Sequence, residues 1–166
     1  MLAALAGLTV LRLIVAAWAP LAPDEAYYWV WSRALAPGYL DHPPMVALWI
    51  RAGTFLVGDT ALGVRLFGPL SVAAGSLLLA DAAERLLPGR QSGWRAATLL
   101  NATLLVGAGA VIMTPDTPLL FFWVMSLWAL ARIAIGGGGA WFGVLGLAVG
   151  LALTSKYTAE QSDKAK

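Results

Sequence analysis

Six side chains of the kinds that carry chemistry stand in short polar stretches of an otherwise apolar sequence: Asp24, Glu25, Asp41, His42, Asp116 and Lys156. A carboxylate can act as a general base, and carboxylates together with a histidine can bind a metal ion. A metal site needs three or four ligands, and the stretch from residue 24 to residue 42 offers four at most. A divalent metal is therefore an open expectation, with Asp41 as one candidate ligand.

The first acidic pair opens a run of aromatic residues. Asp24 and Glu25 follow Pro23, and residues 26–31 are apolar or aromatic. Acidic residues suit the first turn of a helix, and Tyr and Trp suit the membrane interface. We expect a helix over residues 24–35 that lies along the outer surface. Unpaired charge at a lipid boundary is costly, which favours a functional role for Asp24 over a simple helix cap.

The second polar pair precedes two prolines. A residue before proline is pushed out of the helical region, so His42 is expected to be extended, with Asp41 beside it. For His42 alone, the sequence supports a structural role and a functional role equally. Residues 45–57 are too short to span a bilayer and predict a second interfacial or re-entrant helix, and Thr60 is a candidate cap for the next span.

The composition places these residues in a membrane protein. Of the 166 residues, 60% are hydrophobic and 12% are charged, whereas soluble domains are roughly 45–50% apolar and about 25% charged. There is no cysteine, which excludes disulfides and thiolate metal sites. The net charge of +2 and the scattered arginines do not form the basic patch that nucleic acid requires, so membrane lipids are the expected surroundings.

Five segments approach the roughly 20 apolar residues that cross a bilayer. They are residues 2–19, 61–80, 96–113, 119–135 and 141–156. The predicted fold is all-α: a polytopic membrane helix bundle with about five transmembrane helices and two interfacial helices in the first outer loop. The first segment lacks the basic start of a signal peptide and contains Arg12, so we expect it to be retained.

Arginines indicate the orientation. The second and fourth loops hold four arginines: Arg85, Arg90, Arg95 and Arg132. Under the positive-inside rule these loops face the cytoplasm. Counting spans then places the six polar candidates together on the extracytoplasmic face of the inner (plasma) membrane.

Four ordered motifs are similar to those of one enzyme group: Asp24–Trp29 with Tyr39–Pro44, Gly58–Arg65, Thr114–Leu119 and Leu153–Tyr157. The chain resembles the lipid-dependent GT-C glycosyltransferases, namely the protein mannosyltransferases and the bacterial aminoarabinose transferases. The resemblance implies transfer of a sugar from a polyprenyl-phosphate carrier to a lipid, protein or glycan acceptor hydroxyl outside the cytoplasm, with inversion at the anomeric carbon.

The same resemblance implies roles for the polar residues. Asp24 matches the family's leading acidic residue and would be the general base, with Glu25 in support. Lys156 and His42 would bind the carrier phosphate. Asp41 would help to hold a metal, and Asp116 would organise the loops. His42 stands where aminoarabinose transferases tend to have lysine, so no particular sugar is assigned.

Length is the main departure from the family, whose members are several times longer. We expect residues 1–158 to be the N-terminal part of a GT-C membrane domain, and the polar tail 159–166 to be a truncated or artificial end. Two other classes remain open from the sequence alone: a small transporter or channel subunit, and a membrane scaffold without chemistry.

Overall fold

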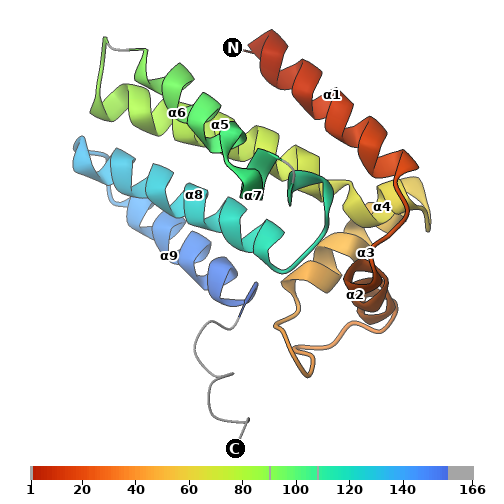
Figure 1. The fold of residues 1–166 in the computed structure, drawn as a ribbon. Helices are drawn as coiled ribbons and strands as arrows, with labels where there is room; N and C mark the ends of the chain where they lie inside the picture. The colour runs from red at the N-terminus through yellow and green to blue at the C-terminus, as the bar shows by residue number, and fades with distance from the viewer. Residues whose placement is uncertain (1, 90, 108, 157–166) are drawn as a thin grey trace, which may run out of the picture.

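The computed structural model describes residues 2–89, 91–107 and 109–156, and within them it contains helices and no strands (Figure 1). The helices in order are α1 (Leu2–Trp18), α2 (Pro23–Arg33), α3 (Met45–Val57), α4 (Ala61–Arg65), α5 (Phe67–Leu86), α6 (Ser92–Ala102), α7 (Leu104–Gly107), the short 3-10 helix η1 (Gly109–Val111), α8 (Asp116–Ala134) and α9 (Ala140–Leu153). The all-α expectation is confirmed, and the expected polar tail lies outside the described residues.

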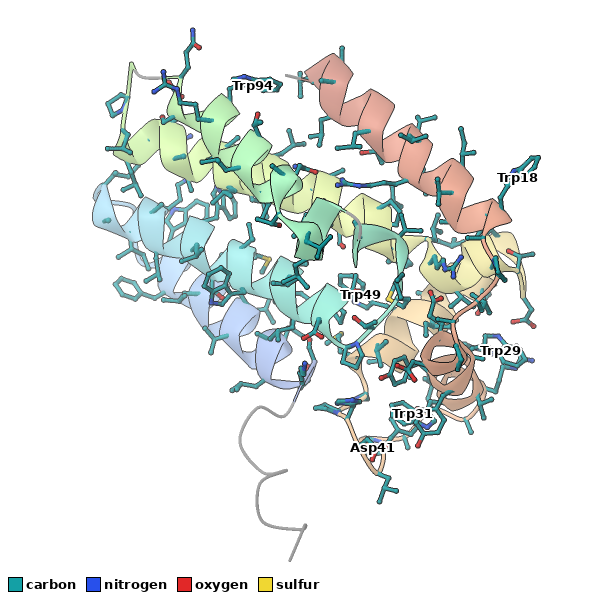
Figure 2. All side chains as sticks on the ribbon, in the orientation of Figure 1. Trp18, Trp29, Trp31, Asp41, Trp49 and Trp94 are labelled. Carbon is teal, nitrogen blue, oxygen red and sulfur yellow. The ribbon has the colours of Figure 1, made fainter. Side chains whose placement is uncertain are left out.

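The long helices form a bundle, and the short helices of the first loop gather at one end of it. Figure 1 shows α5, α6, α8 and α9 lying along one another, with α2, α3 and α4 grouped beyond them. Exposed Trp18 and half-buried Trp29 lie at that end, and exposed Trp94 lies near the other (Figure 2). Tryptophan at both ends of an apolar bundle is typical of helices that cross a bilayer.

The expected count of five spans is not confirmed. Within the described residues, α4 with α5 (Ala61–Leu86) and α8 are long and apolar enough to cross a membrane. A third span results only if α1 and α2 are counted together as one broken helix. These two helices are bent by 85° relative to each other. The helices α1 and α9 are apolar but have 17 and 14 residues.

The third expected span is interrupted, and a buried arginine occupies the interruption. The helix α6 ends before Thr103, whose backbone is extended at φ −69° and ψ 144°. From α1, Arg12 is 3% exposed and donates to the side chain of Asn101 at 2.8 Å and to the carbonyls of Val106 and Gly107 at 3.1 and 3.2 Å. Backbone groups freed inside a membrane need partners, so Arg12 is a structural donor that permits the break.

The two predicted helices of the first loop are present. The helix α2 begins one residue earlier than expected, α3 has the expected bounds, and the backbone N–H of Gly63 donates to the hydroxyl of Thr60 at 3.0 Å as a cap of α4. Their apolar faces meet in one core with Met113: Tyr28, Trp31, Val46, Ala47, Ile50 and Val64. This core fixes the first loop as a packed unit.

Close backbone packing fixes the turn between α8 and α9. Gly136 has a φ of +85°, which favours glycine. A Cβ built on Gly137 would lie 2.5 Å from the carbonyl oxygen of Arg132 and 2.7 Å from the ring of Trp141, whereas one built on Gly138 would meet no atom within 4 Å. The glycine run is therefore a closely packed turn at Gly137.

Candidate functional site

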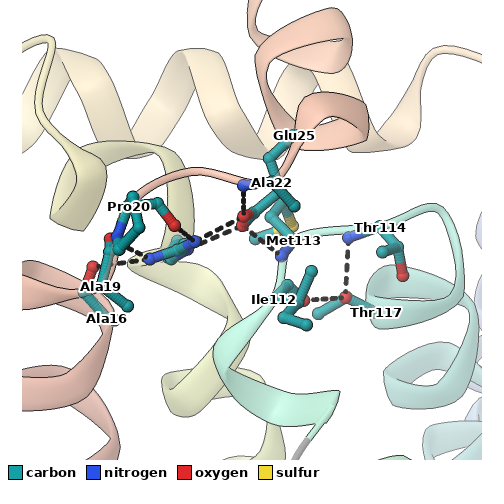
Figure 3. A network of polar contacts seen from close by, with 10 residues as sticks. Ala16, Ala19, Pro20, Ala22, Glu25, Ile112, Met113, Thr114 and Thr117 are labelled. Carbon is teal, nitrogen blue, oxygen red and sulfur yellow. Dashed lines mark hydrogen bonds and ion pairs between the residues drawn. The ribbon is translucent and has the colours of Figure 1, made fainter.

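A buried ion pair lies where α1, α2, α4 and the loop before α8 meet (Figure 3). Glu25 has a fully buried side chain, and Arg65, which is 3% exposed, contacts both of its oxygens. The backbone N–H of Met113 donates to Oε1 of Glu25 at 3.0 Å, and that of Ala22 donates to Oε2 at 2.9 Å. Both carboxylate oxygens therefore accept two hydrogen bonds each, which satisfies a buried carboxylate.

Arg65 uses its remaining donors on the end of α1. Its two terminal nitrogens donate to the carbonyls of Ala16 at 3.2 Å, Ala19 at 2.8 Å and Pro20 at 2.8 Å. With the bonds to Glu25, all five N–H groups of the guanidinium are engaged. These carbonyls lie at and just beyond the last turn of α1, where no helical N–H is left to bind them.

Glu25 does not have the geometry of a proton acceptor. Burial raises the pKa of Glu25, but the bonds from Arg65, Met113 and Ala22 outweigh it and hold that pKa below its ordinary value. In the structure Glu25 joins the helix that carries Asp24 to the loop that leads to Asp116, and its supporting role in catalysis stays a prediction.

Asp24 lies on the other side of the same helical turn. Its side chain is exposed and makes no hydrogen bond or ion pair with any other residue that the structure describes. Successive residues of a helix point about 100° apart, which is why two adjacent carboxylates have such different surroundings. Asp24 is therefore the carboxylate of this pair that is open to solvent.

The other two carboxylates of the predicted site lie near Tyr28. After burial, the negative charges of Asp24, Asp41 and Asp116 are the main causes that raise the pKa of Tyr28. The hydroxyl of Tyr27 donates to Asp41 at 3.0 Å, and this bond raises the pKa of Tyr27. Three carboxylates from three separate parts of the chain thus converge on α2.

Lys156 is paired with Asp116, the third of these carboxylates. Nζ of Lys156 lies 2.8 Å from Asp116, and both side chains are partly exposed, at 33% and 41%. The backbone N–H of Met45 donates to the carbonyl of Thr154 at 3.2 Å, which joins the start of α3 to the end of α9. Lys156 is thereby held beside the first loop.

His42 lies against the aromatic side chains of α2. Its ring is 6.0 Å from that of Tyr28 and 6.3 Å from that of Trp31, between centroids. Nδ1 of His42 is buried and has no hydrogen-bond partner. Its backbone carbonyl accepts the N–H of Tyr39 at 3.0 Å, so the ring is held by packing, and its predicted contact with phosphate stays a prediction.

The candidate metal ligands are not grouped together in the part of the chain that the structure describes. Among the described residues, no three of the His, Asp and Glu side chains are grouped so that they could hold a metal ion. Asp41 is instead bound to Tyr27. The divalent metal that the sequence left open stays a prediction.

Sequence reasoning missed Arg65 as the partner of Glu25. It lies 40 positions away along the chain and appeared in the sequence only as the last residue of the Gly58–Arg65 motif. An arginine inside an apolar segment needs a buried partner, and this was the available signal. Tyr27 and Tyr28 were read only as interface aromatics, because nothing in the sequence shows that carboxylates surround them.

Two comparisons with known proteins give matches. The sequence profile described as dolichyl-phosphate-mannose-protein mannosyltransferase matches residues 41–160. The lipid A galacturonosyltransferase RgtD of Rhizobium johnstonii is 39% identical over 135 residues, which are 81% of this chain and 28% of that protein. The chain thus spans under a third of the length of this relative. No solved structure matches the chain. Since the profile covers most of the chain, the protein belongs to the dolichyl-phosphate-mannose-protein mannosyltransferase family of membrane GT-C glycosyltransferases.

Proposed function

We propose that the protein forms a catalytic part of an inverting glycosyltransferase, which takes a sugar from a polyprenyl-phosphate carrier on the extracytoplasmic face of the membrane. The observation that carries this proposal is that exposed Asp24, which has no bonding partner among the described residues, and Asp116, which holds Lys156, both act on Tyr28 of α2. Family membership supplies the reaction class, and the positions of Asp24 and Lys156 supply the roles.

Asp24 is the proposed general base. Its carboxylate takes the proton of an acceptor hydroxyl as that oxygen attacks the anomeric carbon. The bond between the anomeric carbon and the phosphate oxygen breaks, and the electron pair leaves with the phosphate. Attack opposite the leaving group inverts the anomeric carbon in a single step.

Lys156 is the proposed partner of the leaving phosphate. The phosphate gains negative charge as the bond breaks, and a cation already in place stabilises that charge. Asp116 holds Nζ of Lys156 at 2.8 Å and so positions it before the carrier arrives. His42 is the second candidate for phosphate contact, and its half-buried ring lies against Tyr28 of α2.

The acceptor is proposed to be a lipid or glycan of the cell envelope. The relative of known activity is named for transfer of galacturonic acid to lipid A. Polyprenyl-phosphate galacturonic acid and lipid A are therefore the first donor and acceptor to test with this protein.

The test separates binding from chemistry. Purified protein in detergent is titrated with polyprenyl phosphate, and transfer is measured from the radiolabelled carrier-linked sugar to lipid A. Lys156→Ala should weaken carrier binding, while Arg51→Ala, which removes an exposed cation of α3, should not. Asp24→Asn should abolish transfer by protein that still binds the carrier. Undiminished transfer by Asp24→Asn would remove Asp24 as the base.

A further inference from the structure

A cluster of charged and aromatic side chains lies where the ends of α5 and α8 meet the start of α9, at the end of the bundle opposite α2, α3 and α4 (Figure 1). This group, called the Asp81 cluster, consists of Asp81 and Arg85 of α5, Trp128 and Arg132 of α8, and Trp141 of α9. Among the described residues, α4 with α5, and α8, are long and apolar enough to cross a membrane. Arg85 and Arg132 lie in the last turns of these spans, so we expect both arginines at the level of the lipid headgroups.

Asp81 is shared by two arginines. Its Oδ2 lies 2.9 Å from Nε of Arg85 and 3.0 Å from Nη2 of Arg132, and it accepts the indole N–H of Trp128 at 2.8 Å. The carboxylate of Glu84, also on α5, accepts a backbone N–H at the start of α6 at 3.1 Å instead. Two guanidinium groups therefore face one carboxylate, and these three side chains keep a net charge of +1.

The two arginines are held in different ways. Arg85, whose side chain is 38% exposed, contacts Asp81 through Nε alone, and its two terminal nitrogens make no hydrogen bond with any residue that the structure describes. The guanidinium of Arg132 lies 5.3 Å from the ring of Trp128 and 5.0 Å from that of Trp141, and the two rings are perpendicular. Arg132 is thus fixed by packing, while Arg85 presents a free guanidinium edge.

A similar group at the other end of the bundle has no surplus charge. There, Arg33 lies 5.7 Å from the ring of Trp29, and its Nη1 binds both oxygens of Asp59 at 3.0 and 2.8 Å. The indole of Trp29 donates to the same carboxylate at 3.3 Å. One arginine meets one carboxylate, and the group is neutral. The Asp81 cluster has the same kinds of side chain with one arginine more, and pairing within the described protein does not account for it.

We infer that Arg85 and Arg132 bind the phosphate of an anionic phospholipid at this end of the bundle. The planar guanidinium group donates two parallel hydrogen bonds to a phosphate, and the terminal nitrogens of Arg85 are placed to do so. Three apolar side chains near the arginines in sequence are 47–50% exposed: Leu86, Leu130 and Ile135. They give the acyl chains of a lipid a surface to pack on, which a free phosphate would not use.

The charge of the cluster favours an anionic headgroup over a zwitterionic one. Phosphatidylcholine carries a quaternary ammonium beside its phosphate, and this cation would meet the guanidinium of Arg85. Aromatic rings attract such an ammonium, but Arg132 already lies over the rings of Trp128 and Trp141. Phosphatidylglycerol has the same phosphate with a neutral glycerol, so it can neutralise the surplus charge without bringing a second cation.

Native mass spectrometry of the protein in detergent would measure binding of phosphatidylglycerol and phosphatidylcholine with identical acyl chains. Wild-type protein should prefer phosphatidylglycerol. Arg85→Gln removes an exposed cation and should weaken phosphatidylglycerol binding about fivefold, which is the contribution of one basic residue at an anionic membrane surface. Arg95→Gln removes an exposed arginine of α6 that is outside the Asp81 cluster, and this control should bind as the wild type does.

A second variant should change binding in the opposite direction. Asp81→Asn removes the carboxylate that competes with the phosphate for both arginines, and it keeps a side-chain oxygen for the indole N–H of Trp128. Phosphatidylglycerol should therefore bind to Asp81→Asn about fivefold more tightly than to the wild type. A gain of binding cannot result from a failure to fold.

Four results would overturn the inference. Equal affinity of the wild type for the two lipids would mean that the headgroup charge is not recognised. Equal losses in Arg85→Gln and Arg95→Gln would mean diffuse attraction of lipid to the whole surface. Displacement of phosphatidylglycerol by glycerol 1-phosphate at equal concentration would mean a site for soluble phosphates. Unchanged or weaker binding by folded Asp81→Asn would mean that the two arginines do not hold the phosphate.

Discussion

Replacing Glu25 by glutamine tests whether this residue holds the fold or performs chemistry. The substitution keeps the shape of the side chain but removes its charge, and it places an amide N–H₂ group against donors from Arg65 and either Ala22 or Met113. Arg65 would then be a cation at 3% exposure without a counter-charge. Removing one member of a buried ion pair costs about 3–5 kcal/mol, so we expect Glu25→Gln to be strongly destabilising.

The expected loss corresponds to a large change in melting temperature. For a chain of this size, 1 kcal/mol lowers Tm by about 2–4 °C, so Glu25→Gln should lower it by roughly 6–20 °C. The change is measured by tryptophan fluorescence on heating in detergent. Asp24→Asn is the matched control, since its exposed side chain makes no bond to another described residue, and surface changes of this kind stay within about 0.5 kcal/mol.

A Tm for Glu25→Gln within about 2 °C of the wild type, a change of at most about 1 kcal/mol, would refute this reasoning. If such a variant also lost sugar transfer, Glu25 would have to act on the substrate, and the buried pair would not be the element that joins α2 to Met113. Loss of stability in Asp24→Asn would contradict the assignment of Asp24 as a residue that does not hold the fold. It would show that Asp24 has a partner that holds the fold.

Three further predictions concern stability. The pKa of Glu25 is lowered in the folded state, so its contribution is full above the ordinary value of about 4.3 and is lost as pH falls through the folded-state pKa. The free energy of unfolding should therefore drop more steeply below that pH in wild-type protein than in Glu25→Gln. Gly137→Ala, with its Cβ 2.5 Å from a backbone oxygen, should cost about 1–3 kcal/mol, and Gly138→Ala should not. Arg12→Leu leaves the carbonyls of Val106 and Gly107 without their donor and should cost about 1–3 kcal/mol for each, seen as faster amide exchange in this segment.

Each of these predictions has a clear contrary result. Parallel pH profiles for the wild type and Glu25→Gln would mean that the Glu25 pKa is not lowered by folding. Equal stability of the two glycine variants would mean that the turn between α8 and α9 has room for a side chain. Unchanged amide exchange in Arg12→Leu would mean that other donors bind the carbonyls of the interrupted helix. Arg95→Leu, which removes an exposed arginine, is the control and should leave exchange unchanged.

Local patterns in the sequence were sufficient for most of the helices. Proline followed by acidic residues marked the start of α2, and the proline pair before Met45 marked the start of α3. Both signals act within a few residues, through helix dipole and backbone sterics. The order of polar and apolar segments also placed Asp116 and Lys156 on one face, and the structure brings these two side chains into contact.

Pairing between distant residues could not be read in the same way. Hydropathy treats Arg12 as an interruption of the first segment and residues 96–113 as an unbroken span. In the structure these two irregularities explain each other, because Arg12 supplies donors to the carbonyls that the break in the third segment exposes. No propensity scale contains such a term, since it depends on which segments lie side by side.

The adjacent residues Asp24 and Glu25 show why loss of activity alone would not identify the base. A helix turns about 100° per residue, so one carboxylate of such a pair can face inward while the other faces outward. The inward one, Glu25, binds Met113, three positions before Asp116. A displacement of Glu25 would therefore shift both Asp24, the proposed base, and Asp116, the carboxylate that holds Lys156. Substitution at either position is therefore expected to abolish sugar transfer, and only the stability of the protein separates the residue that reacts from the residue that positions it.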